Sequence, residues 1–360
     1  MANRVALQAA CLAALACVLL GACHSAPLAD RQTSATNQVA TNKEIARRFL
    51  LSIRAKDAAA MRAVLAPNVR LTLMIAGVYS PELHAFPQGT HWDGDAMIKM
   101  EMDFQKDLAG PFALQILSLI GEGDLVAAEV VGSGVRAATG RSYVQHYSYH
   151  FQLSQGLIVD IRLYQDTFHL WDIWNNFGSA ACPPYHPTDK VVGAAAEEAG
   201  SDGDQADPIA TNKESVRRFL MAVRTRDPQA ERAVWALDGV WSFAVGGDYS
   251  PALHAFQGAP RWDREAMISM QQSAQNKLKE PLTLDIYSLV GEGNEVSVEA
   301  IGFLVRADGR AYRQHYSMHF KAHAGKLIEG HVYQDTLHQY DLGLEHSRYA
   351  PVAAPLSPAQ

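Results

Sequence analysis

A six-residue pattern that combines an aromatic residue, a carboxylate and an imidazole occurs twice in the chain. It reads Tyr-Gln-Asp-Thr, one apolar residue and His, and spans Tyr164–His169 and Tyr333–His338. A pocket carboxylate can remove a proton from a carbon next to a carbonyl, while a nearby phenol stabilises the resulting oxyanion. An aspartate at the start of a helix can instead serve as its N-cap. The pattern leaves three roles open for Asp166 and Asp335: general base, ligand contact and helix cap.

Each pattern lies where a predicted strand ends and a predicted helix begins. In the first occurrence the strand covers residues 157–165 and the helix covers residues 168–176. On a regular strand Tyr164 lies two residues from Asp166 and shares its face. We therefore expect both side chains to point into one pocket, and Tyr333 to accompany Asp335 in the same way.

The region around the pattern is duplicated. Thr41 recurs as Thr211, 170 residues later, and the blocks 79–86 and 118–123 recur at the same spacing as 249–256 and 288–293. The block 145–151 recurs as 314–320, a spacing of 169, so one residue is missing from the second copy. The loss falls in a turn, where changes of length are tolerated. The chain therefore contains two copies of one globular domain rather than a solenoid.

Helices are expected at the start of each copy. Thr41 with Glu44 matches a capping box, as does the equivalent pair in the second copy, and apolar residues follow at helical spacing. Asp57 and Asp227 are typical caps of a short second helix, which we expect to end near Ala66-Pro67. A third helix is expected over residues 93–106. We predict a strand at 71–75, and four more at 112–120, 125–135, 143–153 and 157–165, in a meander with the helices on one side.

This order of elements resembles the SnoaL-like polyketide-cyclase group of the nuclear-transport-factor-2-like superfamily. The likeness is carried by Trp-Asp before the third helix (92–93 and 262–263), a Tyr-rich strand and the Tyr-x-Asp-Thr-x-His pattern. It covers residues 41–172 and 211–341. It implies an α+β fold of two tandem cone-shaped domains, each a curved antiparallel sheet wrapped around N-terminal helices. Members of the superfamily include isomerases, cyclases, epoxide hydrolases and proteins without catalysis, so the resemblance leaves the activity open.

The resemblance also places the acid of the group's motif at Asp166 and Asp335, and it implies a pocket in each cone. We expect ligand contacts from residues at the mouth and on the inner face. For the segment before the third helix, the alternative is an ordered surface loop anchored by Phe and Trp. The candidates are Tyr79, His84, Trp92, Tyr147, Tyr164 and His169 in the first copy and Tyr249, His254, Trp262, Tyr316, Tyr333 and His338 in the second.

The histidines that match between the copies do not have the spacing of a metal site. His146 and His150 are four residues apart on one predicted strand, so at about 3.3 Å per residue their β-carbons would lie roughly 13 Å apart. No paired-cysteine or His-Glu-x-x-His spacing occurs. We therefore expect neither a metal nor another cofactor.

Strand alternation gives the same segment two different faces. Tyr147, Tyr149 and Phe151 share one face, and His146, Ser148 and His150 share the other. Large aromatic side chains belong in the cone. We expect the polar face to pack against the equivalent face of the second copy, so that the two domains form a pseudo-dimer within one chain.

The N-terminus predicts the cellular address. Arg4 precedes an apolar run over residues 5–20 that is too short to span a membrane, and Leu-Gly-Ala-Cys follows at 20–23. This resembles a bacterial lipoprotein signal and implies a lipid anchor on Cys23. The residue after it is His24 where inner-membrane lipoproteins often carry Asp, which favours the outer membrane, facing the periplasm. The alternative is an ordinary secretory signal with an incidental cysteine. If Cys11 and Cys17 leave with the signal and Cys23 is lipidated, Cys182 remains as the only candidate free thiol.

Composition completes the domain plan. We assign a signal peptide (1–22), a tether (23–40), domain 1 (41–178), a linker (179–209), domain 2 (210–345) and a tail (346–360). The linker and tail are rich in Ala, Pro and polar residues, which cannot form a core. The formal net charge is −7 with no basic stripe, so a nucleic-acid partner is not expected.

The expected function is the binding of a small apolar molecule by a lipid-anchored protein of the cell envelope. The first alternative is an isomerase, cyclase or hydrolase that uses a pocket Asp as general base. The second is a non-catalytic interaction scaffold. An open pocket with the Asp bonded to helix N–H groups favours binding, an Asp that points into the pocket favours an enzyme, and a filled cone favours a scaffold.

Overall fold

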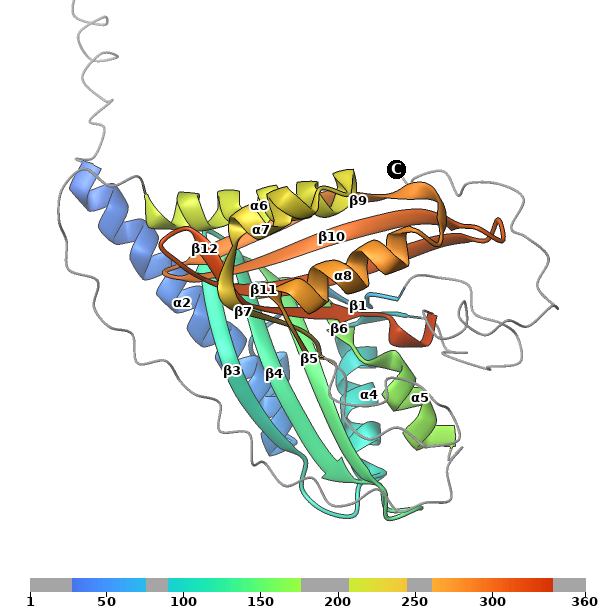
Figure 1. Ribbon diagram of the computed structural model, residues 1–360. Coiled ribbons are helices and arrows are strands. Elements are labelled where there is room, and N and C mark those ends of the chain that lie inside the picture. The colour runs from blue at the N-terminus through green and yellow to red at the C-terminus, as the bar shows by residue number, and fades with distance from the viewer. Residues whose placement is uncertain (1–27, 76–89, 176–206, 245–260, 339–360) are drawn as a thin grey trace, which may run out of the picture.

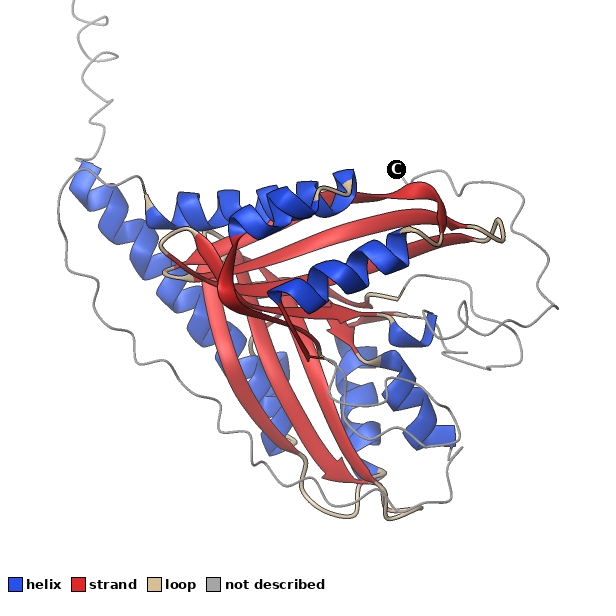
Figure 2. Cartoon of the chain, in the orientation of Figure 1, coloured by secondary structure: helices blue, strands red, loops and turns tan. Residues whose placement is uncertain are grey.

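The computed structural model describes residues 28–75, 90–175, 207–244 and 261–338. It contains two six-stranded sheets, each with helices packed on one face (Figure 1, Figure 2). The elements of domain 1 are α2 (Leu28–Ala55), α3 (Ala58–Arg62), β1 (Leu65–Leu73), β2 (His91–Asp93), α4 (Gly94–Lys106), β3 (Ala113–Glu122), β4 (Leu125–Val135), β5 (Ser142–Ser154), β6 (Leu157–Gln165) and α5 (Thr167–Asn175). Those of domain 2 are α6 (Pro208–Thr225), α7 (Pro228–Val234), β7 (Trp235–Phe243), β8 (Arg261–Asp263), α8 (Arg264–Gln275), β9 (Leu278–Glu292), β10 (Glu295–Arg306), β11 (Ala311–His323) and β12 (Lys326–Gln334).

The two sheets have the same strand order. It is β2-β1-β6-β5-β4-β3 in domain 1 and β8-β7-β12-β11-β10-β9 in domain 2. The predicted four-strand meander and the α+β class are confirmed. The sheets are mixed rather than wholly antiparallel, because β1 runs parallel to β6 and β7 runs parallel to β12. In each domain this first strand follows the two N-terminal helices. It pairs with the last strand of the meander and runs in the same direction.

The capping boxes expected at Thr41 and Thr211 are wrong. The helix α6 begins earlier, with Asp207 as N-cap and Pro208 in the first turn, and the Thr211 hydroxyl donates to the Asp207 carbonyl within the helix. Aspartate followed by proline is a strong start signal, because proline needs no N–H partner there. In domain 1 the helix α2 already begins at Leu28, so the expected tether of residues 23–40 includes helical residues.

The aspartates expected at helix starts lie at the starts of helices. Asp57, Asp227 and Asp93 cap α3, α7 and α4 through their carboxylates. The second helix, however, ends at Arg62, and Pro67 lies inside β1. A register shift separates the β1 pairs before and after Pro67, and such an irregularity tolerates a residue without an N–H.

Each cone has its own core. In domain 1 the inward face of β5 contributes Tyr147, Tyr149 and Phe151, as the alternation predicted, and Phe151 packs edge-on against Phe49 of α2. In domain 2 the core is built around an aromatic cluster on α6, β7 and β11, namely Phe219, Trp235, Trp241 and Phe320. The polar faces of the two sheets are directed towards each other.

Candidate functional site

The two aspartates of the repeated pattern lie where the domains meet. Asp166 Oδ1 accepts hydrogen bonds from His169 N, at 3.0 Å, and from the Thr336 hydroxyl of domain 2. Asp335 Oδ1 accepts from His338 N, at 3.1 Å, and from the Thr167 hydroxyl of domain 1, at 2.6 Å. Each carboxylate is thus bonded to the helix that follows it and to the other domain.

The threonines complete the arrangement. Thr336 Oγ1 accepts from Phe168 N, and Thr167 Oγ1 accepts from Leu337 N, each at 3.0 Å. The first turn of each helix is therefore capped by its own aspartate and by the threonine of the other domain. We call Asp166, Thr167, Asp335 and Thr336 the crossed cap, and all four are at most 2% exposed. Of the three roles left open by the sequence, this geometry corresponds to the helix cap.

Neighbouring residues hold the crossed cap in place. Gln145 Nε2 donates to the Asp166 carbonyl at 2.8 Å, and Gln314 Nε2 donates to the Asp335 carbonyl at 2.9 Å. The two candidate histidines of the pattern stack on tyrosines of the long strands β5 and β11. His169 lies parallel to Tyr143 at 5.7 Å, and His338 lies parallel to Tyr312 at 4.9 Å.

The expectation that Tyr164 shares the cone with Asp166 is wrong. The Tyr164 hydroxyl donates to Glu299 of domain 2 at 2.9 Å, and the Tyr333 hydroxyl donates to Glu129 of domain 1 at 2.8 Å. Tyr164 pairs across the sheet with Ser148, so it belongs to the polar face. The intervening Leu163 is in the core, and the strand ends before Asp166.

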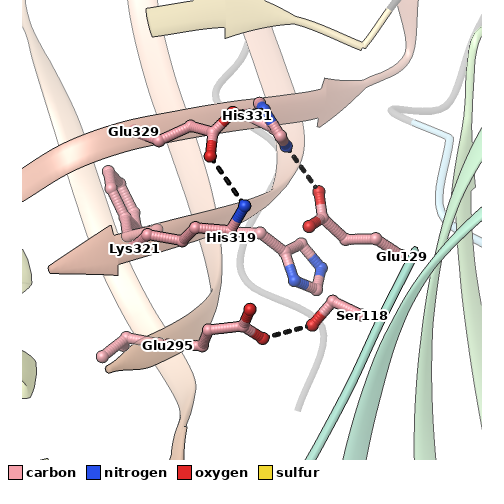
Figure 3. Close-up of a pocket in the computed structure, with 9 residues that line it drawn as sticks. Ser118, Glu129, Glu295, His319, Lys321, Glu329 and His331 are labelled. Atoms are coloured by element: carbon pink, nitrogen blue, oxygen red, sulfur yellow. Dashed lines mark hydrogen bonds and ion pairs between the residues drawn. The ribbon is translucent and has the colours of Figure 1, made fainter. Parts of the chain in front are cut away.

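Two buried glutamates at equivalent positions organise this interface. Arg162 of domain 1 forms two hydrogen bonds with Glu299, at 2.8 and 2.7 Å. The position equivalent to Arg162 is His331 in domain 2, whose Nδ1 lies 2.8 Å from Glu129 Oε1. Figure 3 shows His331 pointing across the interface at Glu129, with Glu329 of its own strand on its other side.

The charge states of the interface histidines differ. Burial lowers the pKa of His150 to about 3, and burial also lowers the pKa of His319, so both rings are neutral. Burial acts on His331 in the same direction, but Glu129 and Glu329 outweigh it and raise its pKa to about 10. His331 therefore carries the positive charge that Arg162 carries on the other side.

The centre of the interface is a pair of equivalent serines. Ser148 and Ser317 share a hydrogen bond of 2.8 Å, and the rings of His319 and His150 each reach the serine of the other domain at 2.8 Å. Contacts that repeat with the domains exchanged define an isologous interface. Within the described ranges, no group of three or more His, Cys, Asp and Glu residues is placed to hold a metal ion.

Domain 2 also contains a large cavity inside its cone. Its volume is about 720 Å³, within the usual range of small-molecule pockets. Helices α6 and α8 and the inner face of the sheet line it, mostly with apolar side chains. The lining residues are Phe219, Leu220, Val223, Trp241, Phe243, Met270, Gln271, Ala274, Gln275, Lys277, Leu278, Leu282, Leu284, Leu304, Arg306, Ala307, Asp308, Tyr312, Tyr316, Met318, Val332 and Gln334.

Two of the sequence candidates belong to this cavity or its wall. Tyr316 lines it directly, and Trp262 on β8 packs edge-on against the lining residue Phe243 at 5.2 Å. Burial raises the pKa of Tyr316 and of Tyr312, so both phenols stay protonated and can donate hydrogen bonds. Gln314 Nε2 donates to the Tyr312 hydroxyl at 2.7 Å, and the Tyr312 hydroxyl also shares a hydrogen bond with that of Tyr316.

The same region of domain 1 is occupied by aromatic side chains. Phe104 packs edge-on against Phe112 at 5.4 Å and against Tyr143 at 5.5 Å, and it stacks on Trp174 of α5 at 5.3 Å. Arg136 lies over the Trp174 ring at 5.0 Å and donates to the backbone of α5. These rings and the helix α5 pack together inside the first cone.

Two substitutions between the copies accompany this contrast between the cones. At the 170-residue spacing, Phe104 corresponds to Ala274 and Phe112 to Leu282. Both smaller residues line the cavity of domain 2. This difference was visible in the sequence and is the signal that could have located the pocket. The lining glutamines Gln271 and Gln275 were not among the sequence candidates.

The remaining candidates divide into two groups. Trp92 on β2 packs against the first core, and Tyr147 is buried there with its hydroxyl 2.9 Å from that of Tyr143. The others lie outside the described residues, namely Tyr79, His84, Tyr249, His254 and Cys23. In the part of the chain that the structure describes, no helix is long and apolar enough to cross a membrane.

Comparisons with known proteins gave one match to a family model and several similar solved structures. Residues 46–161 match the model of the SnoaL-like domain. None of the curated proteins matches the chain. Similar solved structures include IdmH from Streptomyces antibioticus (16% identity, 39% of this chain and 100% of that chain, TM-score 0.31). Another is an NTF2-like protein from Burkholderia thailandensis (20% identity, 37% of this chain and 96% of that chain, TM-score 0.32). A third is an LEH-like epoxide hydrolase from M. tuberculosis (15% identity, 38% of this chain and 93% of that chain, TM-score 0.31). Residues 46–161 are thus similar to the SnoaL-like domain, and the sheet of the second copy has the same strand order as that of the first.

Proposed function

We propose that the chain is a lipid-anchored binding protein whose second domain takes up one small apolar molecule. The observation that carries this proposal is the cavity of about 720 Å³ in the second cone, lined mostly by apolar and aromatic side chains. Pockets of this size and composition bury most of the surface of a drug-sized molecule, and apolar burial then provides the affinity.

The first domain has a supporting role in this proposal. Phe104, Phe112, Tyr143 and Trp174 pack together inside its cone, and its polar face packs on the polar face of domain 2. Domain 1 therefore acts as the permanent partner of domain 2, so that the chain forms its own pseudo-dimer. The scaffold alternative thus applies to the first domain and the binding role to the second.

A general-base role for Asp335 or Asp166 receives less support. A catalytic base must reach the proton that it removes from a bound substrate. The Oδ1 atom of each aspartate instead accepts bonds from a helix N–H and from a threonine of the other domain. Asp335 is also absent from the residues that line the cavity. Binding without catalysis is the simpler function for this pocket.

The lipid anchor and the cell-envelope address rest on the N-terminal sequence alone. The Leu-Gly-Ala-Cys segment at 20–23 supports lipidation of Cys23, and His24 supports an outer-membrane location facing the periplasm. Radiolabelled palmitate fed to the host should label the protein, and Cys23→Ala should abolish the labelling. Labelling of the Cys23→Ala protein would contradict the anchor.

The binding role is tested by filling the cavity. Ala274→Phe introduces into the second cone the side chain that Phe104 provides in the first. N-phenyl-1-naphthylamine, a neutral apolar probe whose fluorescence rises in apolar sites, should bind the parent protein, and Ala274→Phe should weaken this at least tenfold. The matched control Phe104→Ala changes the other cone and should leave the probe's first binding event intact. Equal binding by Ala274→Phe and the parent would place the probe elsewhere and refute the proposal.

A further inference from the structure

The cavity of domain 2 has polar groups in its wall whose hydrogen-bonding capacity is unused. Gln275 is 5% exposed, and its Nε2 donates to the Val223 carbonyl at 2.8 Å. Its Oε1 has no hydrogen-bond partner among the residues that the structure describes. Because Nε2 is committed to a carbonyl, the orientation of the amide is fixed and the free atom is an acceptor. A buried acceptor left unpaired is unfavourable, so a ligand group that donates to it gains affinity.

A second acceptor and two donors share the same wall. Gln271 Oε1 is also buried without a partner in the described residues, and so is the Trp241 Nε1 donor. Tyr316 is half-buried and lines the cavity with a protonated phenol. The wall therefore offers both acceptors and donors, which suits a group that can donate and accept at once.

The charged residues that line the cavity lie at its rim rather than beside the unpaired polar groups. Lys277 is exposed, and Arg306 and Asp308 form an ion pair of 3.2 Å, with Arg310 bonded to the same carboxylate at 2.7 Å. These charges belong to the rim. The unpaired groups further in are neutral amides, an indole and a phenol, so they provide no counter-charge for an ionised ligand.

We propose that the molecule bound in the second cone is a neutral lipophile that carries a hydroxyl group; this inference rests on the function proposed above. The hydroxyl donates to the amide oxygen of Gln275 or Gln271 and accepts from the phenol of Tyr316 or the indole of Trp241. The rest of the molecule is apolar and fills the space that Phe104 and Phe112 occupy in the first cone. A carboxylate at the same depth would face the glutamine oxygens and be repelled.

The test compares three probes of one shape: 4-hydroxybiphenyl, 4-methoxybiphenyl and biphenyl-4-carboxylate. Each is titrated into the full-length protein by calorimetry, with displacement of N-phenyl-1-naphthylamine as the second readout. We expect 4-hydroxybiphenyl to bind about three- to tenfold more tightly than its methyl ether, since one net hydrogen bond provides about 0.5–1.5 kcal/mol. Gln275→Met should remove this preference and leave the affinity for 4-methoxybiphenyl unchanged.

Controls separate recognition from folding. Gln105→Met removes the equivalent bond in domain 1, from Gln105 Nε2 to the Ile53 carbonyl at 2.7 Å, and should leave the preference intact. Tyr316→Phe retains the ring and should reduce the preference even if Gln275→Met folds poorly. Equal affinities for the alcohol and the ether, or tightest binding of the carboxylate, would overturn this inference alone. Failure of all three probes to bind would overturn the proposed function, and this inference with it.

Discussion

Removal of one hydroxyl from the crossed cap should destabilise the whole chain. Thr336→Val retains the shape of the side chain but loses its Oγ1. That atom donates to the Asp166 carboxylate and accepts from Phe168 N at 3.0 Å, and both partners belong to domain 1. The variant therefore acts on one domain through a residue of the other.

The expected magnitude follows from these two bonds. A hydrogen bond to a charged group contributes about 1.5–3 kcal/mol and one to a neutral backbone group about 0.5–1.5 kcal/mol. Asp166 and Thr336 are 1% and 2% exposed, so water does not replace the lost partner. We expect Thr336→Val to lower the free energy of unfolding by about 2–4 kcal/mol.

Urea unfolding followed by circular dichroism measures this loss. Thr336→Ser keeps the hydroxyl and should restore all but about 1 kcal/mol. The matched control is Thr225→Val, because the Thr225 hydroxyl donates only to carbonyls within α6 and is near the surface. It should change the stability by no more than about 0.5 kcal/mol.

Two results would refute the reasoning. The first is a loss for Thr336→Val no larger than that for Thr225→Val, which would mean that the crossed cap does not hold the domains together. The second is an equal loss for Thr336→Ser and Thr336→Val, which would attribute the effect to packing rather than to the hydroxyl.

Three further predictions concern the interface and the cones. The pKa of His331 is about 10 in the folded protein, above the ordinary 6.5, so its contribution to stability is complete below about pH 6.5 and is lost as pH rises towards 10. His331→Arg should remove this alkaline loss, and parallel urea midpoints for variant and parent at about pH 6 and 10 would contradict this. Burial raises the pKa of Glu101 from 4.5 to about 7, so the ionised form is disfavoured on folding and stability falls as pH rises between these values. Glu101→Gln should raise the thermal midpoint at about pH 8 and not at about pH 4; an equal effect at both pH values would exclude this cause. An added β-carbon at Gly302 would lie 2.8 Å from Tyr316 Cε2, so Gly302→Ala should displace that ring and weaken N-phenyl-1-naphthylamine binding, whereas Gly110→Ala meets no atom within 4 Å and should bind normally.

The architecture was largely predictable from local signals and the internal repeat. The strands β4 and β6 were predicted at their observed bounds, since alternation and turn residues determine both ends. Asp57, Asp93 and Asp227 were recognisable caps or helix starts because each precedes a short helical run. The helix α6 begins earlier than expected because the Asp207-Pro208 start signal lies in a stretch whose composition predicts a linker.

The chemistry of the repeated pattern could not be settled in the same way. An aspartate that caps a helix and one that acts as a general base look the same in sequence, and one partner of Asp166, the Thr336 hydroxyl, lies far along the chain. Tyr164 was placed on the wrong face because the strand ends at Gln165, so the alternation does not extend to Asp166.

The pocket depends on packing between distant segments. Ala274 on α8 stands where the first copy has Phe104, and it lines the cavity together with residues of α6 and of the sheet. The sequence shows that alanine replaces phenylalanine at this position, whereas the cavity also depends on how the helices pack around it.

The most direct test of the account is native mass spectrometry of the protein purified from its host. The account predicts one neutral apolar adduct per chain, retained by Phe104→Ala and lost in Ala274→Phe. Two equivalent adducts per chain, or an adduct that survives Ala274→Phe, would contradict the assignment of binding to the second cone.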